Sequence, residues 1–275
     1  MKTTILLGFL IGAIALAQGS VIPGDAIRAN DERIIQGWPA VDGQFPHQVH
    51  LRLVTPTGTL NACGGSLIDP QWVLTAAHCV IAKTQVFVRL GGINVTMPGL
   101  ILEATDFFVH PQYNPNNANN DVALVNLGRR VPSSATIRPI RLPGKDALNE
   151  TYVGALATAS GWGRIGNTLP VSETLNYVNL IVIENSRCVL DFVNHNEIIV
   201  DSTICAIGIE SPAQSTCNGD SGGPLIHVED DGIPTLIGVV SFVNDNGCDY
   251  DSASGYVRPQ FFLDWINESI AAGKR

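Results

Sequence analysis

The chain has 275 residues and a formal net charge of -9, with 45% hydrophobic and 15% charged residues. Such an acidic balance argues against nucleic acid as a partner. The low share of charged residues is typical of a globular protein and excludes a disordered chain, and the length suits one large domain or two small subdomains.

The first residues indicate a secretory leader. Lys2 precedes a short apolar run over residues 5–16, and small residues at Ala15-Leu16-Ala17 suit a signal peptidase, with Gly19 as a rival site. The run is too short to span a membrane, and no other stretch approaches the roughly 20 apolar residues that a spanning helix needs. We therefore expect a signal peptide over residues 1–17 and a secreted, extracellular protein that has no membrane partner.

After the leader, short β-branched runs alternate with Gly, Pro and Asn turns, and helical periodicity is scarce. Strands at this density predict an all-β barrel or sandwich. In chain order, the clearest predicted strands are 48–53, 85–90, 122–125, 177–182 and 235–240. Residues 132–150 contain three prolines and could link two halves. Apolar residues at 262, 265, 266 and 270 have helical spacing and predict one amphipathic C-terminal helix.

Two motifs in the first half carry candidate catalytic groups. In Leu74-Thr75-Ala76-Ala77-His78-Cys79, small residues flank the histidine, and the cysteine could pin the turn. In Asn120-Asp121-Val122-Ala123, an acid opens an apolar strand, which is costly unless a partner compensates the buried charge. An imidazole N–H would be such a partner, and the bond would fix the tautomer that acts as a base. The remaining histidines have no comparable context and are interpreted as structural: His47, His50, His110, His195 and His227.

The second half carries a serine in a turn of small residues, Cys217-Asn218-Gly219-Asp220-Ser221-Gly222-Gly223. Glycine permits a tight bend that exposes the hydroxyl beside free peptide N–H groups. That is the geometry of a nucleophile next to an oxyanion hole. By itself the motif could equally be a surface turn, because turns are rich in the same residues.

Cysteines and glycosylation sequons indicate covalent modification of a secreted chain. The six cysteines suit three disulfides, and their number alone leaves the pairing open. No Cys-x-x-Cys pair occurs, so we expect no metal site, and nothing in the sequence calls for a cofactor. Asn94, Asn149 and Asn267 begin Asn-x-Ser/Thr triplets and are candidate glycan sites.

Together, the three motifs resemble the chymotrypsin-like serine proteases, because the order His, Asp, Ser and the surrounding residues match that family. The resemblance extends from Ile34 to about Ile270. It implies two packed antiparallel Greek-key β-barrels with a C-terminal α-helix, and a serine endopeptidase that works through an acyl-enzyme. Ser221 would be the nucleophile, His78 the general base and then acid, and Asp121 the orienting carboxylate. The N–H groups of Gly219 and Ser221 would form the oxyanion hole.

The resemblance also implies a zymogen. Glu32-Arg33-Ile34-Ile35 resembles the activation site of the family, where a trypsin-like protease would cut after Arg33. The freed amine of Ile34 would pair with Asp220. The chain would divide into a signal peptide 1–17, a propeptide 18–33 and a peptidase domain 34–275, with a first barrel about 34–135, a linker about 136–150, a second barrel about 151–260 and a helix about 260–271. The implied disulfides are Cys63–Cys79, Cys188–Cys205 and Cys217–Cys248.

The implied substrate pocket lacks the acid that trypsin-like members have at its base, where this chain has Ser215. A preference for Lys or Arg at P1, the residue before the cut, then loses its counter-charge, and we expect uncharged P1 residues. Val243 would narrow the pocket, as in elastase-like members. The other pocket residues implied by the resemblance are Thr216, Asn218, Ser241 and Ser254. If Asp245, Asp249 or Asp251 reached inside, a basic preference could return; solvated loop acids are the alternative.

We expect protein or peptide substrates, an activating protease, protein inhibitors and a monomeric state. The pocket and the Phe261–Ile266 pattern resemble insect digestive members, which suggests the gut lumen. Residues 91–96 hold no acid where the family's calcium loop has a pair, so no calcium is expected. Two alternatives are a catalytically dead binding homologue, which usually lacks a triad member, and a cascade protease, which usually carries an N-terminal recognition module.

Overall fold

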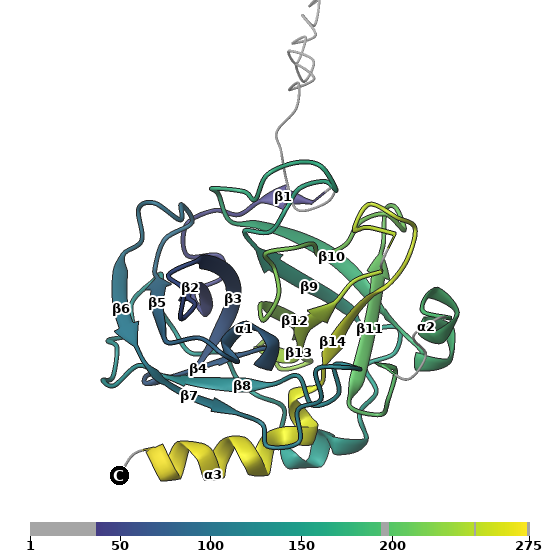
Figure 1. Cartoon of the computed structure of the whole chain (residues 1–275). Helices are drawn as coiled ribbons and strands as arrows, with labels where there is room; N and C mark the ends of the chain where they lie inside the picture. The colour runs from purple at the N-terminus through teal and green to yellow at the C-terminus, as the bar shows by residue number, and fades with distance from the viewer. Residues whose placement is uncertain (1–36, 194–197, 245, 274–275) are drawn as a thin grey trace, which may run out of the picture. The chain divides into compact units, whose positions relative to one another are not determined.

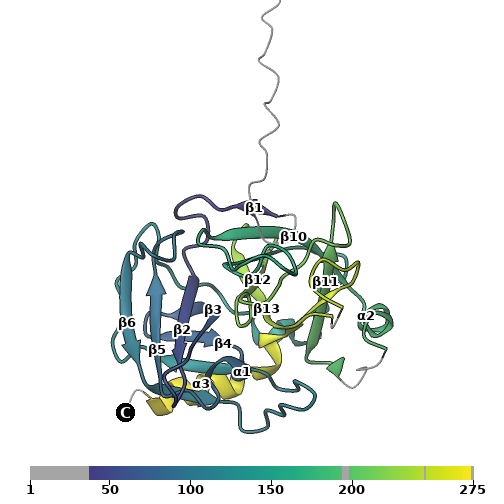
Figure 2. The ribbon, with the colours of Figure 1, turned by 45° about the horizontal axis from the view of Figure 1, so that its top comes forward.

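The computed structural model describes residues 37–193, 198–244 and 246–273. The predicted leader and propeptide, the activation residues Arg33 and Ile34, and also His195 and Asp245 lie outside the described residues. The described chain forms two antiparallel sheets of seven strands each, which lie to the left and right in Figure 1, and three α-helices. Figure 2 shows the same two sheets after a rotation of the view.

The first sheet comes from the first half of the chain. Its strand order is β6-β5-β2-β3-β4-β8-β7. The strands are β2 (Gln48–Val54), β3 (Leu60–Asp69), β4 (Trp72–Thr75), β5 (Gln85–Leu90), β6 (Leu100–Ala104), β7 (Asp106–Val109) and β8 (Ala123–Asn126). The four-residue helix α1 (Ala77–Val80) directly follows β4, so the end of that strand fixes where the helix begins.

The second sheet closes on itself. Its order is β1-β10-β11-β14-β13-β12-β9, and β9 also pairs with β10, so that β9 to β14 form a ring. The strands are β1 (Trp38–Pro39), β9 (Leu156–Gly161), β10 (Asn176–Ile183), β11 (Thr203–Gly208), β12 (Pro224–Val228), β13 (Pro234–Phe242) and β14 (Ser254–Val257). Although β1 is early in the chain, it pairs with β10 of this second sheet.

The remaining elements are short helices around the two sheets. A 3-10 turn, η1 (Lys145–Asn149), lies between the sheets in sequence, and α2 (Asn185–Asp191) follows β10. The chain ends in η3 (Pro259–Phe262) and α3 (Leu263–Gly273), the yellow helix below the first sheet in Figure 1. The predicted C-terminal helix is therefore confirmed, and Phe262 and Ile266 on its apolar side are buried in the core.

Short apolar runs explain why these segments are strands: β4, β8 and β14 are buried throughout, whereas β5 and β10 alternate between buried and more exposed residues. In β5, Val86, Val88 and Leu90 are buried, whereas the residues between them are half-exposed, which is the period of two of a sheet with one covered face. The first core gathers such residues around Trp72, and the second gathers Leu180, Ile204 and Tyr256 inside the ring. The predicted all-β class with two barrel-like sheets is confirmed. Among the described residues, none of the helices is both long and apolar enough to cross a membrane.

Candidate active site

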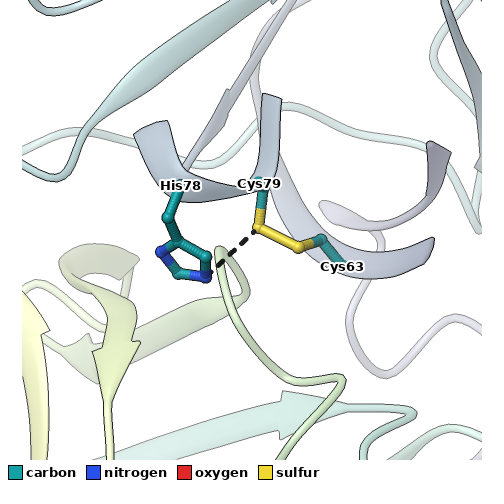
Figure 3. A group of neighbouring side chains, drawn as sticks. All are labelled: Cys63, His78 and Cys79. Carbon is teal, nitrogen blue, oxygen red and sulfur yellow. Dashed lines mark hydrogen bonds between the residues drawn. A yellow bond between two sulfur atoms is a disulfide. The ribbon is translucent and has the colours of Figure 1, made fainter. Parts of the chain in front are cut away.

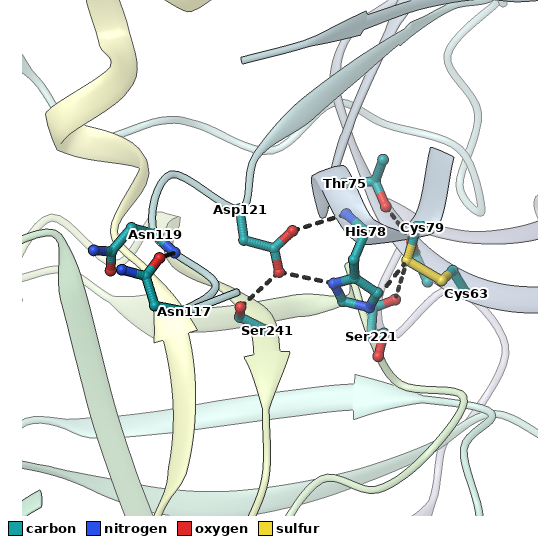
Figure 4. A network of polar contacts seen from close by, with 10 residues as sticks. Cys63, Thr75, His78, Cys79, Asn117, Asn119, Asp121, Ser221 and Ser241 are labelled. Carbon is teal, nitrogen blue, oxygen red and sulfur yellow. Dashed lines mark hydrogen bonds and ion pairs between the residues drawn. A yellow bond between two sulfur atoms is a disulfide. The ribbon is translucent and has the colours of Figure 1, made fainter. Parts of the chain in front are cut away.

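His78 and Asp121 form a hydrogen-bonded pair in which the carboxylate is buried and the imidazole is partly exposed. His78 lies in α1, and Asp121 stands just before β8, which pairs with β4, the strand that leads into α1. The ring Nδ1 of His78 lies 2.7 Å from Asp121 Oδ2, and the backbone N–H of His78 donates to Asp121 Oδ1 at 2.9 Å. Ser241 Oγ also donates to Oδ2, at 2.6 Å (Figure 4). Asp121 is fully buried, so these donors compensate for its lost hydration.

The surroundings of His78 favour its protonated form. Burial lowers the pKa of the imidazole, but the hydrogen bond to Asp121 and the negative charge of that residue together outweigh burial and raise the pKa above 6.5. Because Asp121 accepts at Nδ1, the other ring nitrogen, Nε2, is left to accept a proton. About a third of the side chain remains exposed, so substrate can reach it.

The disulfide Cys63–Cys79 packs against the free edge of this imidazole. Cys79 Sγ lies 3.7 Å from His78 Nε2 (Figure 3). The same sulfur lies 3.6 Å from the carbonyl oxygen of Ser221 (Figure 4). The three residues Cys63, His78 and Cys79 place their nitrogen and sulfur atoms together, but the two sulfurs are bonded to each other and are not thiolate ligands. The disulfide thus brings Ser221 and His78 to one place.

The turn around Ser221 leaves two N–H groups available. Gly219 has φ +105°, a conformation that favours glycine, and a half-buried Ser221 follows Asp220. Neighbouring groups are paired: the Asp220 N–H donates to Cys217 O at 2.9 Å, and Gly64 N–H donates to Ser221 O at 2.7 Å. Within the described part of the chain, by contrast, the N–H groups of Gly219 and Ser221 donate to no protein acceptor. In the same part, no hydrogen bond joins Ser221 Oγ to His78.

Asp220 is enclosed by the backbone. Its carboxylate accepts from Gly163 N–H at 2.7 Å and from Cys217 N–H at 2.9 Å, and the residue is fully buried. A Cβ at Gly161 or Gly163 would overlap the carboxylate, so only glycine fits at both positions. Burial raises the pKa of Asp220 to about 6, and the two backbone hydrogen bonds oppose that rise without cancelling it.

The predicted base of the pocket is buried, polar and uncharged. Ser215 is 3% exposed, and its hydroxyl donates to Cys248 O at 2.6 Å and lies 2.8 Å from Thr216 O. Beside it, the fully buried hydroxyls of Thr216, Ser254 and Tyr256 have no partner within hydrogen-bonding geometry. Burial raises the pKa of Tyr256 to about 12.

We call the described residues from Val243 to Ala253 the outer wall of this region, and their two acidic side chains are exposed to solvent. Val243 packs against the disulfide Cys217–Cys248, whereas Asp249 and Asp251 are exposed. Asp249 is contacted by the side-chain amide of Asn167. Neither of these two carboxylates is therefore buried beside Ser215. Asn218 is exposed, and its carbonyl accepts from Arg164 N–H at 2.9 Å.

The structure gives the pairing of the six cysteines and the surroundings of the three candidate glycan sites. The three disulfides join the pairs that the family resemblance implied: Cys63–Cys79, Cys188–Cys205 and Cys217–Cys248. Asn149 is exposed in η1, and Asn267 is exposed on α3. Asn94 is half-buried, and its Oδ1 accepts from the backbone and the hydroxyl of Thr96 at 2.8 and 2.7 Å.

Sequence reasoning missed three contributors to the site. Ser241 was assigned to the pocket wall, yet its hydroxyl is bonded to Asp121. The pair Gly161 and Gly163, which encloses Asp220, was not singled out, although a Gly-Trp-Gly stretch is a signal of close backbone approach. Asn167 was not noticed at all, since an asparagine in a polar loop carries no distinguishing pattern.

The assembled groups can carry out nucleophilic acyl transfer. A serine hydroxyl, an imidazole with an available Nε2 and a buried carboxylate on the other ring nitrogen are the parts of such a site. The two N–H groups beside the serine supply donors for a developing oxyanion. The residues come from both sheets, because α1 and the start of β8 belong to the first, and Ser221 precedes β12 of the second.

Comparisons with known proteins agree with this chemistry. A family profile described as Trypsin matches residues 34–266. Collagenase from Hypoderma lineatum is 38% identical over 262 residues, which cover 94% of this chain and 96% of the relative. Brachyurin from Leptuca pugilator is 35% identical over 239 residues, covering 85% and 96%. A solved structure titled HL collagenase matches with a TM-score of 0.79 and 39% identity, over 86% of this chain and 99% of that one.

Proposed function

The chain belongs to the trypsin family and is a chymotrypsin-like serine endopeptidase, and on this premise we propose that it is secreted as a zymogen and cleaves proteins after uncharged residues. A digestive role in a gut lumen is part of the same proposal. The observation that carries the P1 preference is the buried, uncharged serine at position 215, while Asp249 and Asp251 of the neighbouring chain segment are exposed.

In the proposed mechanism, Ser221 Oγ attacks the scissile carbonyl carbon while His78 Nε2 takes its proton. Asp121 stabilises the imidazolium, and Ser241 helps to hold that carboxylate. The N–H groups of Gly219 and Ser221 donate to the oxyanion. His78 then protonates the leaving amine, and a water molecule activated by the same imidazole releases the acyl group. Each donor of the oxyanion hole is worth about 10²–10³ in rate.

The proposed pocket selects by shape and by the absence of a counter-charge. A Lys or Arg at P1 would bury its charge among hydroxyls, which is unfavourable without an opposite charge. Ser215 is already bonded to Cys248 O, so its hydroxyl is occupied. Val243 on the disulfide supports a pocket for apolar side chains of small or medium size.

The proposed activation step explains the enclosure of Asp220. The Asp220 carboxylate is fully buried and accepts from two backbone donors among the described residues, and burial raises its pKa, so a cationic partner would be favoured there. We propose that cutting after Arg33 supplies that partner as the amine of Ile34. Before the cut, residues 18–33 would act as a propeptide, following a signal peptide over residues 1–17.

The function can be tested with purified full-length chain, before and after treatment with trypsin. A serine-directed phosphonate should label Ser221 only after treatment, and a Ser221→Ala variant should not be labelled. Peptide anilides that differ only at P1 should then be cleaved faster with Leu, Phe or Ala than with Arg. Faster cleavage of the Arg substrate would refute the P1 preference, and equal labelling before and after treatment would refute the zymogen.

A further inference from the structure

Cys248, on the outer wall of the pocket, is held through its side chain and through both its backbone carbonyl and its backbone N–H. Its sulfur is bonded to Cys217, three residues before Asp220. Its carbonyl accepts from Ser215 Oγ at 2.6 Å. Its N–H donates to Asn167 Oδ1 at 2.8 Å. The last of these bonds comes from a separate loop, between β9 and β10, so the position of the wall depends on that loop.

The side-chain amide of Asn167 makes two contacts with consecutive wall residues. While Oδ1 accepts from Cys248, Nδ2 donates to the carboxylate of Asp249. An asparagine amide is matched to this pair, because it offers one acceptor and one donor side by side. Asp249 is thereby held on the outer side of the wall.

Gly247 makes this close approach possible. Its φ is +114°, which favours glycine, and a Cβ there would overlap the side-chain amide of Asn167. The backbone of the wall therefore passes directly against this side chain.

The loop that carries Asn167 also contacts the catalytic turn. Gly163 N–H donates to Asp220 Oδ1, and Arg164 N–H donates to Asn218 O. Arg164 Nη1 donates to Asn167 O at 3.2 Å, which ties the loop to itself. This one loop thus bonds to Asp220 before the nucleophile, to the predicted pocket residue Asn218 and to the outer wall.

The other edges of the wall are held by a different residue. Asp191, at the end of α2, accepts from Ala253 N–H at 2.9 Å, and Asn244 Nδ2 donates to the carbonyl of Asp191 at 2.6 Å. These bonds hold the wall at its two ends. Its middle depends on the disulfide to Cys217, on Ser215 from the inside and on Asn167 from the outside.

We propose that Asn167 is a positioning residue that sets the width of the P1 pocket by fixing Cys248 and Asp249. The proposal rests on the proposed location of the pocket, but it does not depend on which P1 residue is preferred. Asn167 acts through the wall and not on substrate. Without it, the wall moves outward, and the enzyme binds its best substrates less tightly while discriminating less between P1 side chains of different size.

The test compares trypsin-treated full-length variants on anilides with Ala, Leu, Phe and Arg at P1. Asn167→Ala removes both bonds and is expected to raise KM of the best substrate about tenfold, with kcat within about twofold, and to shrink the ratio of kcat/KM between Phe and Ala substrates at least threefold. Thr168→Ala is the matched control, because Thr168 is exposed in the same loop and its hydroxyl makes no hydrogen bond to the other described residues.

A double variant that exchanges the side chains of Asn167 and Asp249 is expected to restore P1 selectivity. Asn167→Asp alone keeps an acceptor for Cys248 N–H but places two carboxylates together, so it should behave like Asn167→Ala. Combining it with Asp249→Asn restores one donor opposite one acceptor and should return selectivity to within threefold of wild type. The proposal is overturned if Asn167→Ala keeps the wild-type P1 ratios, if it only lowers Tm, or if the exchange is no better than Asn167→Asp. Faster Arg cleavage by wild type would refute the P1 preference alone.

Discussion

Asp220→Asn should affect the chain in different ways before and after cleavage at Arg33. Burial raises the pKa of Asp220 from 3.8 to about 6. At about 1.4 kcal/mol per pKa unit, holding it charged in the uncleaved chain costs about 3 kcal/mol. The stability that Asp220 contributes is fully present below its unfolded pKa of 3.8 and is lost as pH rises through 6. Asparagine carries no such charge, so the variant should lack this pH dependence.

Two opposing contributions to the free energy of unfolding determine how stable the uncleaved Asp220→Asn variant is at pH 8. The variant avoids the cost of about 3 kcal/mol, but one of the two N–H groups, from Gly163 or Cys217, loses its acceptor, which costs about 1–3 kcal/mol. The uncleaved variant should therefore be no less stable than wild type. After cleavage, the amine of Ile34 has no buried anion to pair with, and losing one partner of such a pair costs about 3–5 kcal/mol. Activity should fall by at least about 10²-fold.

The assay combines thermal unfolding of the uncleaved chain between pH 4 and 8 with phosphonate titration and peptide hydrolysis after trypsin treatment. Asp231→Asn is the matched control, because Asp231 is exposed and paired with Arg141 on the surface. Activity of the cleaved Asp220→Asn variant within fivefold of wild type would refute the ion-pair reasoning. A wild-type pH dependence of the uncleaved variant would refute the assigned pKa.

Other predictions follow from single contacts. Ser241→Ala removes a 2.6 Å donor to Asp121 and should lower kcat about tenfold in steady-state kinetics with KM little changed; an unchanged kcat contradicts the contact's role. Activity should fade at alkaline pH, because pairing raises the pKa of the Ile34 amine above its free value of about 8, and a pH profile that stays flat would contradict this. Gly163→Ala should leave less than about 1% activity, because a Cβ overlaps Asp220, and wild-type hydrolysis would exclude that overlap. Burial lowers the pKa of His47 and His50 to about 4, so the stability that these residues contribute is present above pH 6.5 and is lost as pH falls through 4. Urea unfolding of the wild type should show this loss of stability, and the variant with both His47→Leu and His50→Leu should not.

Much of the fold could be predicted from local pattern. The runs at 48–53, 85–90, 122–125, 177–182 and 235–240 correspond to β2, β5, β8, β10 and β13, because short β-branched and apolar runs bounded by turn residues are typical of strands. The pattern cannot report which strands pair. That β1 joins the second sheet, and that β9 closes it against β10, depends on contacts between segments far apart in sequence.

The candidate site divides in the same way. His78, Asp121 and Ser221 could be predicted, because each stands in a short motif whose residue types serve one chemistry. The lack of a counter-charge at the base of the pocket could also be predicted, because Ser215 stands where trypsin-like members have an acid. Only the tertiary structure shows that Ser241 donates to Asp121, that Gly163 encloses Asp220, and that Asn167 holds Cys248. These contacts join residues that are 57 to 120 positions apart. Two of them also use backbone N–H groups, which every residue except proline has and which therefore leave no mark in the sequence.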